Sequence, residues 1–186
     1  MPVNQWSVRV LAISGSLRAR SSNRALLCAA EALAPPGMEW ETYQGLAGLP
    51  HFNPDHDEDG VPVPPPVADL RSRAIAAAGW VISSPEYAHG VPGSLKNALD
   101  WLVSCPELPG KPVLLLNASA AGGSFAQAAL AETLRTMSFR VLDESLTAPF
   151  LSRKLQAGNE LDPAAALLLR RSLEALAVAT RARGAQ

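Results

Sequence analysis

Short apolar runs alternate along the chain with longer segments whose apolar residues recur every three or four positions. The runs at 8–13, 80–84 and 112–116 are almost continuously apolar, which is typical of strands buried on both faces of a sheet. The segment 38–43 alternates weakly and predicts a more peripheral strand, and 139–142 predicts a fifth strand at an edge. The chain therefore contains five expected strands.

The segments between these runs have the spacing of amphipathic helices. We expect helices at 23–33, 67–78, 126–137 and from Pro163 to about residue 183, the last capped by Asp162. A further helix follows the third strand, and its apolar stripe is formed by Leu95, Ala98, Leu99, Leu102 and Val103.

Strands that alternate with helices predict a doubly wound, parallel α/β sheet, here as a single domain over residues 1–186. Five strands and this length favour a flavodoxin-like three-layer sandwich of strand order 2-1-3-4-5 over the larger dinucleotide-binding order. In that order the chain switches direction between the first and third strands. The loops that meet there, at 14–23 and 85–93 with 118–124 beside them, are also rich in glycine and serine. Their coincidence predicts a ligand site.

Composition narrows the class of protein. Of the 186 residues, 48% are hydrophobic and 18% are charged, and the net charge is −1, which argues against a general nucleic-acid or membrane-surface binder. Cys28 and Cys105 have neither disulfide-framework nor metal-ligand spacing. No signal peptide or membrane-spanning run is evident, so we expect a cytoplasmic protein.

The loop at 14–24 has the composition of an anion site. It contains four hydroxyls, one side-chain amide, three arginines and no acidic residue, and it precedes a helix whose N-terminus has free N–H groups. These donors match the oxygens of a phosphate group. The alternative is that Ser21, Ser22 or Asn23 only caps the helix and that the arginines are solvated. A P-loop and a G-x-G-x-x-G motif are both absent.

Other candidate residues have a structural reading beside the functional one. The His- and Asp-rich loop at 51–59 fits no metal motif, and a solvated acidic loop is favoured. His89 either contacts a substrate or only occupies a turn. Cys28 is expected to pack in the core. Trp101 lies off the apolar stripe of its helix, and it either faces a partner subunit or is partly buried within one subunit.

Two motifs carry a resemblance to a known family. The first loop matches G-S-x-R-x-x-S-x-N, and the segment 85–101 matches P-E-Y-N-x-S-x-P-G-x-L-K-N-A-x-D-W. Two positions depart from the second motif, because Ala88 replaces the usual Asn and Gly90 the usual Ser. From Val8 to about Met137 the chain resembles the NAD(P)H-dependent FMN reductases, flavodoxin-like enzymes that include quinone, chromate and azo-dye reductases.

The resemblance implies FMN as cofactor, NADPH or NADH as co-substrate and a small-molecule electron acceptor such as a quinone or free flavin. It implies no metal and no catalytic side chain, because the cofactor carries the chemistry. It implies a homodimer or homotetramer. The FMN phosphate would be held by Ser16, Arg18, Ser21, Ser22 and Asn23. The flavin ring would be lined by Pro85, Glu86, Tyr87 and Ala88, and by backbone at Ser119, Gly122 and Gly123.

Two alternatives remain at this point. One is an FMN-binding electron carrier without NAD(P)H oxidation, ranked lower because such carriers are typically strongly acidic. The other is a family member that has lost flavin through its altered central loop.

Overall fold

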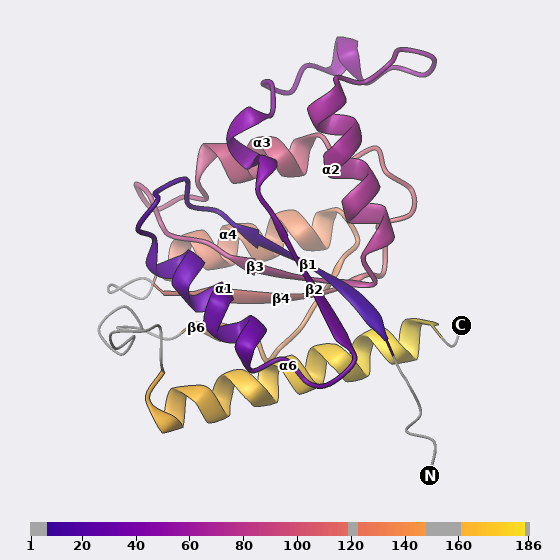
Figure 1. The fold of residues 1–186 in the computed structure, drawn as a ribbon. Helices are drawn as coiled ribbons and strands as arrows, with labels where there is room; N and C mark the ends of the chain where they lie inside the picture. The colour runs from indigo at the N-terminus through magenta and orange to yellow at the C-terminus, as the bar shows by residue number, and fades with distance from the viewer. Residues whose placement is uncertain (1–6, 119–122, 148–160, 185–186) are drawn as a thin grey trace.

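A computed structural model describes residues 7–118, 123–147 and 161–184. Figure 1 shows strands alternating with helices along the chain. The strands are β1 (Val8–Ser14), β2 (Met38–Tyr43), β3 (Gly79–Ser83), β4 (Pro112–Asn117), β5 (Arg140–Val141) and β6 (Leu146–Thr147). The helices are α1 (Ser22–Ala32), α2 (Pro65–Ala76), α3 (Gly93–Asp100), α4 (Ser124–Thr136) and α6 (Pro163–Gly184), with short 3₁₀ turns η1 (Gly45–Gly48) and η2 (Pro54–His56).

The strands form a parallel sheet of order β2-β1-β3-β4-β5, which confirms the predicted order. The fifth strand predicted at 139–142 is confirmed as β5, and the same edge continues in β6, which the sequence did not predict and which also pairs with β4. Between them, the Ser145 hydroxyl oxygen accepts a hydrogen bond from the N–H of Leu115 at 3.1 Å. A side chain therefore takes the place of a backbone acceptor where the edge strand breaks.

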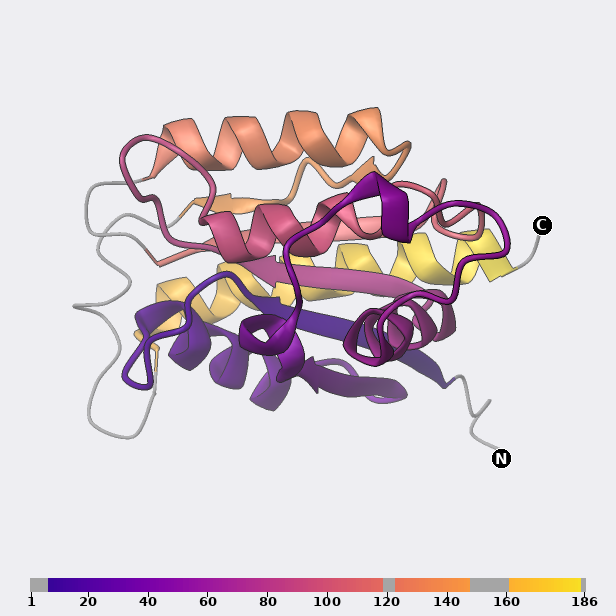
Figure 2. The ribbon, with the colours of Figure 1, turned by 90° about the horizontal axis from the view of Figure 1, so that it is seen from above.

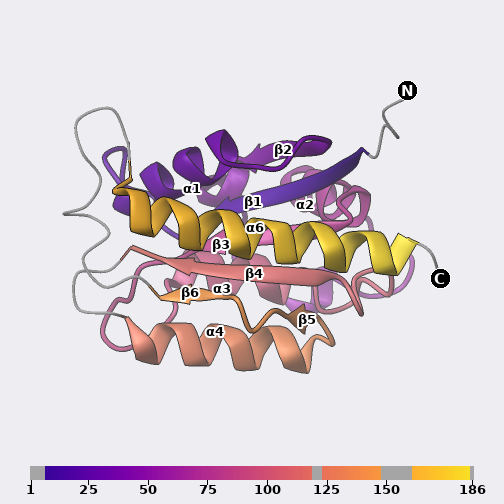
Figure 3. The same ribbon diagram turned by 90° about the horizontal axis from the view of Figure 1, so that it is seen from below.

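Helices cover both faces of the sheet. Helices α2, α3 and α4 pack on one face and α1 and α6 on the other (Figures 2 and 3). Along β1, Leu11 and Ile13 belong to the first core, whereas Val10 and Ala12 belong to the second. Double-sided burial explains why the central strands are apolar at every position rather than at alternate ones. None of the helices in the described part of the chain combines the length and apolar character needed to span a bilayer.

Helix geometry overturns two of the sequence expectations. Cys28 is exposed, because the side chains of Leu26 and Leu27 face the sheet and Cys28 lies on the opposite side of α1. Val103 is 66% exposed, since α3 ends at Asp100 and the following turn rotates this side chain away from the core. The expected cap of α6 is confirmed, because a carboxylate oxygen of Asp162 accepts from the N–H of Ala165 at 2.9 Å.

Trp101 is fully buried, so its interpretation as a partner-facing residue is wrong. The segment between β2 and α2 covers it. The indole N–H donates to the carbonyl of Pro50 at 2.9 Å. The Phe52 ring packs edge-on against the indole, with 5.0 Å between the ring centroids. The Asn97 side chain adds a hydrogen bond from the N–H of Phe52 at 2.7 Å. In the acidic loop, Asp57 forms an ion pair with Arg71 at 2.5 Å. This long loop is therefore fixed on α3 by side chains.

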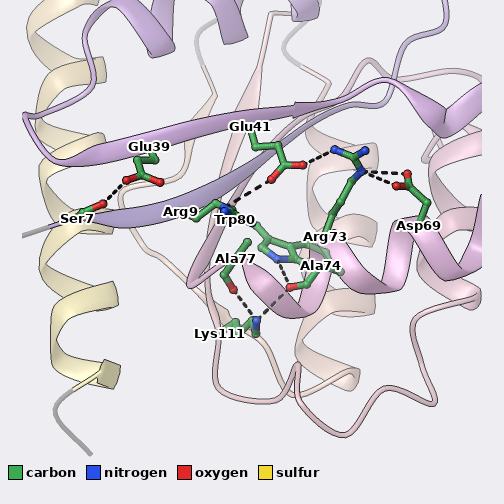
Figure 4. A network of polar contacts seen from close by, with 10 residues as sticks. All are labelled: Ser7, Arg9, Glu39, Glu41, Asp69, Arg73, Ala74, Ala77, Trp80 and Lys111. Carbon is green, nitrogen blue, oxygen red and sulfur yellow. Dashed lines mark hydrogen bonds and ion pairs between the residues drawn. The ribbon is translucent and has the colours of Figure 1, made fainter.

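Charged side chains line the junction between the edge strand β2 and helix α2 (Figure 4). Glu41 pairs with Arg73 and lies 3.9 Å from the guanidinium of Arg9, and Arg73 also bonds Asp69 at 2.9 Å. Every charge in this group has an opposite partner, so the group balances charge at an exposed sheet edge rather than forming a site.

Lys111 is a buried cation that completes the end of α2. It is only 2% exposed, and its ammonium donates to the carbonyls of Ala74 at 3.0 Å, Ile75 at 2.5 Å and Ala77 (Figure 4). Burial, together with the positive charge of Arg183, lowers the pKa of Lys111 to about 8. That pKa is still above 7, so at neutral pH the side chain has three protons for the three carbonyls at the helix C-terminus.

Replacing Lys111 with Met is expected to lower the free energy of unfolding by about 1–3 kcal/mol, because buried carbonyls at the end of α2 lose their donor while the volume is nearly kept. Urea unfolding of the wild type and the variant measures the difference. Lys96→Met is the control: Lys96 is exposed and, within the described part of the chain, forms its one ion pair with Asp100, so this change is expected to cost less than about 0.5 kcal/mol. Equal losses for the two variants would contradict the role assigned to Lys111.

Candidate functional site

The loops that follow β1 and β3 lie at the same end of the sheet, as Figure 1 shows. The N–H of Gly15 donates to the carbonyl of Ser83 at 2.8 Å. A Cβ added at Gly15 would lie 2.6 Å from the Ser84 hydroxyl oxygen and 3.1 Å from a Leu95 methyl carbon. Glycine at this position thus permits the first loop to pack against the end of β3, as the predicted switch point requires.

The first loop leaves its positive charges free. The Ser21 hydroxyl oxygen caps α1 by accepting from the N–H of Arg24 at 3.4 Å, and the Ser16 hydroxyl oxygen accepts from the N–H of Arg18 at 3.3 Å. Arg18, Arg20 and Arg24 are exposed, and none of them forms an ion pair with a described residue. Ser21 therefore caps α1, and its hydroxyl can still donate to a ligand, while the guanidinium groups beside it have no ion-pair partner among the described residues.

Asn23, predicted as a phosphate ligand, is 5% exposed, and its side chain accepts two hydrogen bonds from other parts of the protein. Its side-chain oxygen accepts from the hydroxyl of Ser83 at 2.9 Å and from the N–H of Ala118 at 3.2 Å. One amide therefore links the first turn of α1 to the ends of β3 and β4. Ser22 begins α1 and is partly exposed, and Ser16 and Ser21 are each 9% exposed.

The segment after β3 forms a tight hairpin. The N–H and carbonyl groups of Tyr87 and Gly90 bond each other at 3.1 and 2.9 Å. Between them, Ala88 and His89 both have positive φ, at 48° and 60°. Two consecutive residues of positive φ define a type I′ turn, in which Asn and Gly are the favoured residues. Ala88 therefore adopts the left-handed conformation, although it lacks the polar side chain with which Asn lowers the energy of that conformation through a local hydrogen bond.

Glu86, which the resemblance places beside the flavin ring, bonds helix α4 through its side chain. Its carboxylate accepts from the N–H of Ala126 at 2.9 Å, in the first turn of α4, and lies 3.7 Å from His89. Helix α4 has no side-chain cap of its own, because its N-cap residue is Gly123. Glu86 therefore supplies the missing cap from the loop after β3 and ties that loop to α4.

A cavity of about 440 Å³ lies between the two loops. This volume is within the range of small-molecule sites. Tyr87 and Leu17 are 51% and 58% exposed at this cavity, and Arg18 reaches it from the first loop. The sequence did not single out Leu17 or Ser94, since each falls at a variable position of its motif. The residues that line the cavity are Gly15, Leu17, Arg18, Tyr87, Pro92, Gly93 and Ser94.

The third loop is described only at its ends. Ser119 and Gly122 lie outside the described residues. Gly123 has a φ of 57°, and the side-chain amide of Asn117 donates to its carbonyl at 3.2 Å. A Cβ at Gly123 would lie 2.2 Å from the nitrogen of that amide, so glycine is required here. Pro85 is partly exposed at the start of the hairpin loop.

Comparison with known proteins agrees with this geometry. The family model described as NADPH-dependent FMN reductase matches residues 8–150. The chain belongs to this family. An NAD(P)H-dependent FMN reductase of Pseudomonas aeruginosa is 38% identical over 91% of this chain and 93% of its own length. A quinone reductase of Escherichia coli is 34% identical over 84% of this chain and 82% of its own length.

Solved structures show the same fold. FerB of Paracoccus denitrificans, a flavoenzyme NAD(P)H:(acceptor) oxidoreductase, superimposes with a TM-score of 0.82 at 25% identity, and the match covers 94% of this chain and 97% of that one. For this member of the FMN reductase family, both motif departures lie in the hairpin. Ala88 occupies a turn position that suits Asn, whereas Gly90 has no positive φ, and a Cβ there would make only an ordinary contact with the carbonyl oxygen of Tyr87 at 3.6 Å.

Replacing Ala88 with Gly is expected to raise the free energy of unfolding by about 1 kcal/mol, because the left-handed conformation costs about 1–2 kcal/mol for a residue with a Cβ. Thermal and urea unfolding measure the change. Ala128→Gly, on the exposed side of α4, is the matched control and should destabilise by about 1 kcal/mol. If both changes destabilise, the strain at Ala88 is not significant.

Proposed function

We propose that this protein is an NAD(P)H-dependent flavin reductase that binds FMN between its first and central loops and passes electrons to a quinone or a similar small acceptor. The observation that carries the proposal is the 440 Å³ cavity, which has on one side an arginine that pairs with no described carboxylate and on the other an exposed tyrosine. Family membership and the flavoenzyme fold support the same activity. The proposal treats residues 1–186 as one domain.

The residues present suit FMN. The proposed phosphate contacts are Arg18, the hydroxyls of Ser16 and Ser21, and the free N–H groups at the start of α1. Arg18 can reach both the phosphate and the cavity, because it lines the cavity and has no ion-pair partner among the described residues. Tyr87 offers a flat aromatic surface for the ring. We propose the same role for Pro85, Ala88 and Gly123, and for Ser119 and Gly122, which the structure does not describe.

FMN, when bound, supplies the redox chemistry, accepting a hydride from the nicotinamide and delivering electrons to the acceptor. The protein contributes binding and orientation. Leu17 and Tyr87 leave an exposed apolar rim beside the cavity, which suits a second planar molecule. Two substrates that use this surface in turn require no catalytic side chain. Overall, NAD(P)H and a proton convert a quinone to a hydroquinone.

We also propose a homodimer or homotetramer in the cytoplasm. The oligomer rests on the family resemblance and on the large exposed side chains of Phe125 and Val103, which are 59% and 66% exposed. The location rests on Cys28 and Cys105 being free thiols. Neither proposal affects the assignment of the cavity.

Mixing the FMN-loaded protein with NADPH or NADH in the absence of oxygen is expected to bleach the visible flavin absorbance, and later addition of benzoquinone is expected to restore it. The two steps are separable because each substrate reacts in the absence of the other. A protein that holds FMN but is bleached by neither nucleotide would instead be an electron carrier. A protein that retains no FMN would have lost the cofactor through its altered central loop.

Arg18→Ala is expected to weaken FMN binding by about 1.5–3 kcal/mol, the typical value of a hydrogen bond to a charged group. Titration of the apoprotein with FMN, followed by flavin fluorescence, measures the change. Arg20→Ala is the matched control, since it removes the same charge from the same loop at a residue that does not line the cavity. Equal losses for both variants would indicate a general charge effect rather than a contact made by Arg18.

A further inference from the structure

Asn23 connects three parts of the site that are far apart in the sequence. The side chain lies in the first turn of α1, and its oxygen accepts one hydrogen bond from β3 and one from the residue that follows β4. The partners, Ser83 and Ala118, are 60 and 95 positions away. They are 0% and 2% exposed, so solvent does not compete for these bonds.

We infer that Asn23 is a positioning residue that couples the phosphate end of the flavin site to the loops that hold the ring. This inference rests on the proposed function, because it assumes that the ligand is a flavin with its phosphate beside α1. It differs from the role implied by the family resemblance, in which Asn23 is only a phosphate contact.

The chemistry of the amide fixes the direction of each of its groups. A backbone N–H can only donate, so the group facing Ala118 must be the oxygen of Asn23, and the nitrogen must face away from it. That nitrogen has no hydrogen-bond partner among the described residues. Asn23 is the second residue of α1 after the cap Ser21. The backbone N–H groups at this end of a helix are free to bind an anion. The side-chain oxygen of Asn23 thus bonds other parts of the protein, and its NH₂ group is available to donate to a phosphate.

The consequence is that a flavin without a phosphate should still depend on Asn23. Ser83 immediately precedes the segment that carries Tyr87, and Ala118 begins the third loop. Without the Asn23 oxygen, two buried donors lose their shared acceptor, and the ends of β3 and β4 lose their link to α1. A residue that only contacted the phosphate would have no effect on riboflavin, which has the same ring and no phosphate.

The test titrates the full-length apoprotein with FMN and, separately, with riboflavin, and follows flavin fluorescence. Asn23→Ala is expected to weaken binding of both ligands by about tenfold or more, the loss that corresponds to a buried hydrogen bond of ordinary strength. Asn23→Asp keeps the acceptor but loses the donors and adds a negative charge. It should therefore bind riboflavin within about twofold of the wild type and bind FMN at least about tenfold more weakly.

Asn53→Asp is the matched control, because Asn53 caps the distant η2 turn, and it should change neither affinity. If Asn23→Ala does not fold, Ser83→Ala removes one of the two bonds and should weaken both flavins by the same factor. Wild-type riboflavin affinity in Asn23→Ala, or in Ser83→Ala where that variant replaces it, overturns the positioning role. Wild-type FMN affinity in Asn23→Asp overturns the phosphate-facing role of the nitrogen. A wild-type protein that binds neither flavin would instead overturn the proposed function itself.

Discussion

The site depends on how buried polar groups are satisfied where β1, β3 and β4 end. These strands are apolar on both faces. Where the chain leaves the sheet, little water is therefore available to hydrogen-bond its backbone N–H and C=O groups. The Asn23 oxygen takes the N–H of Ala118, and the Ser83 carbonyl takes the N–H of Gly15. These bonds place three loops side by side. The first of these loops reaches the cavity at Gly15, the residue that bonds the end of β3.

Charge is distributed unevenly over the same molecule. At the junction of β2 and α2, Arg9 and Arg73 share Glu41, and Arg71 pairs with Asp57. In the first loop, by contrast, arginines lie beside a helix N-terminus with no described carboxylate to neutralise them. Concentrated positive charge destabilises a fold unless an anion offsets it, so the arrangement is explained by a ligand more readily than by stability. The near-neutral total charge therefore coexists with a local cluster of positive charge in the first loop.

The sequence predicted the parallel sheet and its order well, because double-sided burial leaves a continuous apolar signal. It failed where a side chain bonds a backbone group distant in sequence, since such bonds have no periodicity. The sequence left open whether Trp101 faces a partner subunit or is partly buried, and only the segment around Pro50 shows what covers it. At the edge, the hydroxyl oxygen of Ser145 accepts from the N–H of Leu115 between β5 and β6, a bond that no pattern in the sequence indicates. In the site, glycine and serine content located the loops, but it gave no sign that the carboxylate of Glu86 bonds the first turn of α4.

The longest motif of the chain combines two physical tasks along one helix. Its first half includes the hairpin and the start of α3, where Pro92 and Ser94 line the cavity. Its second half provides Asn97 and Trp101, which hold the segment around Pro50 through bonds to backbone groups. Because α3 is only eight residues long, a shift of its far end would move the near end as well. The residues that bind the long loop thus also fix one wall of the cavity, and the motif is long because the wall and its support lie on one short helix.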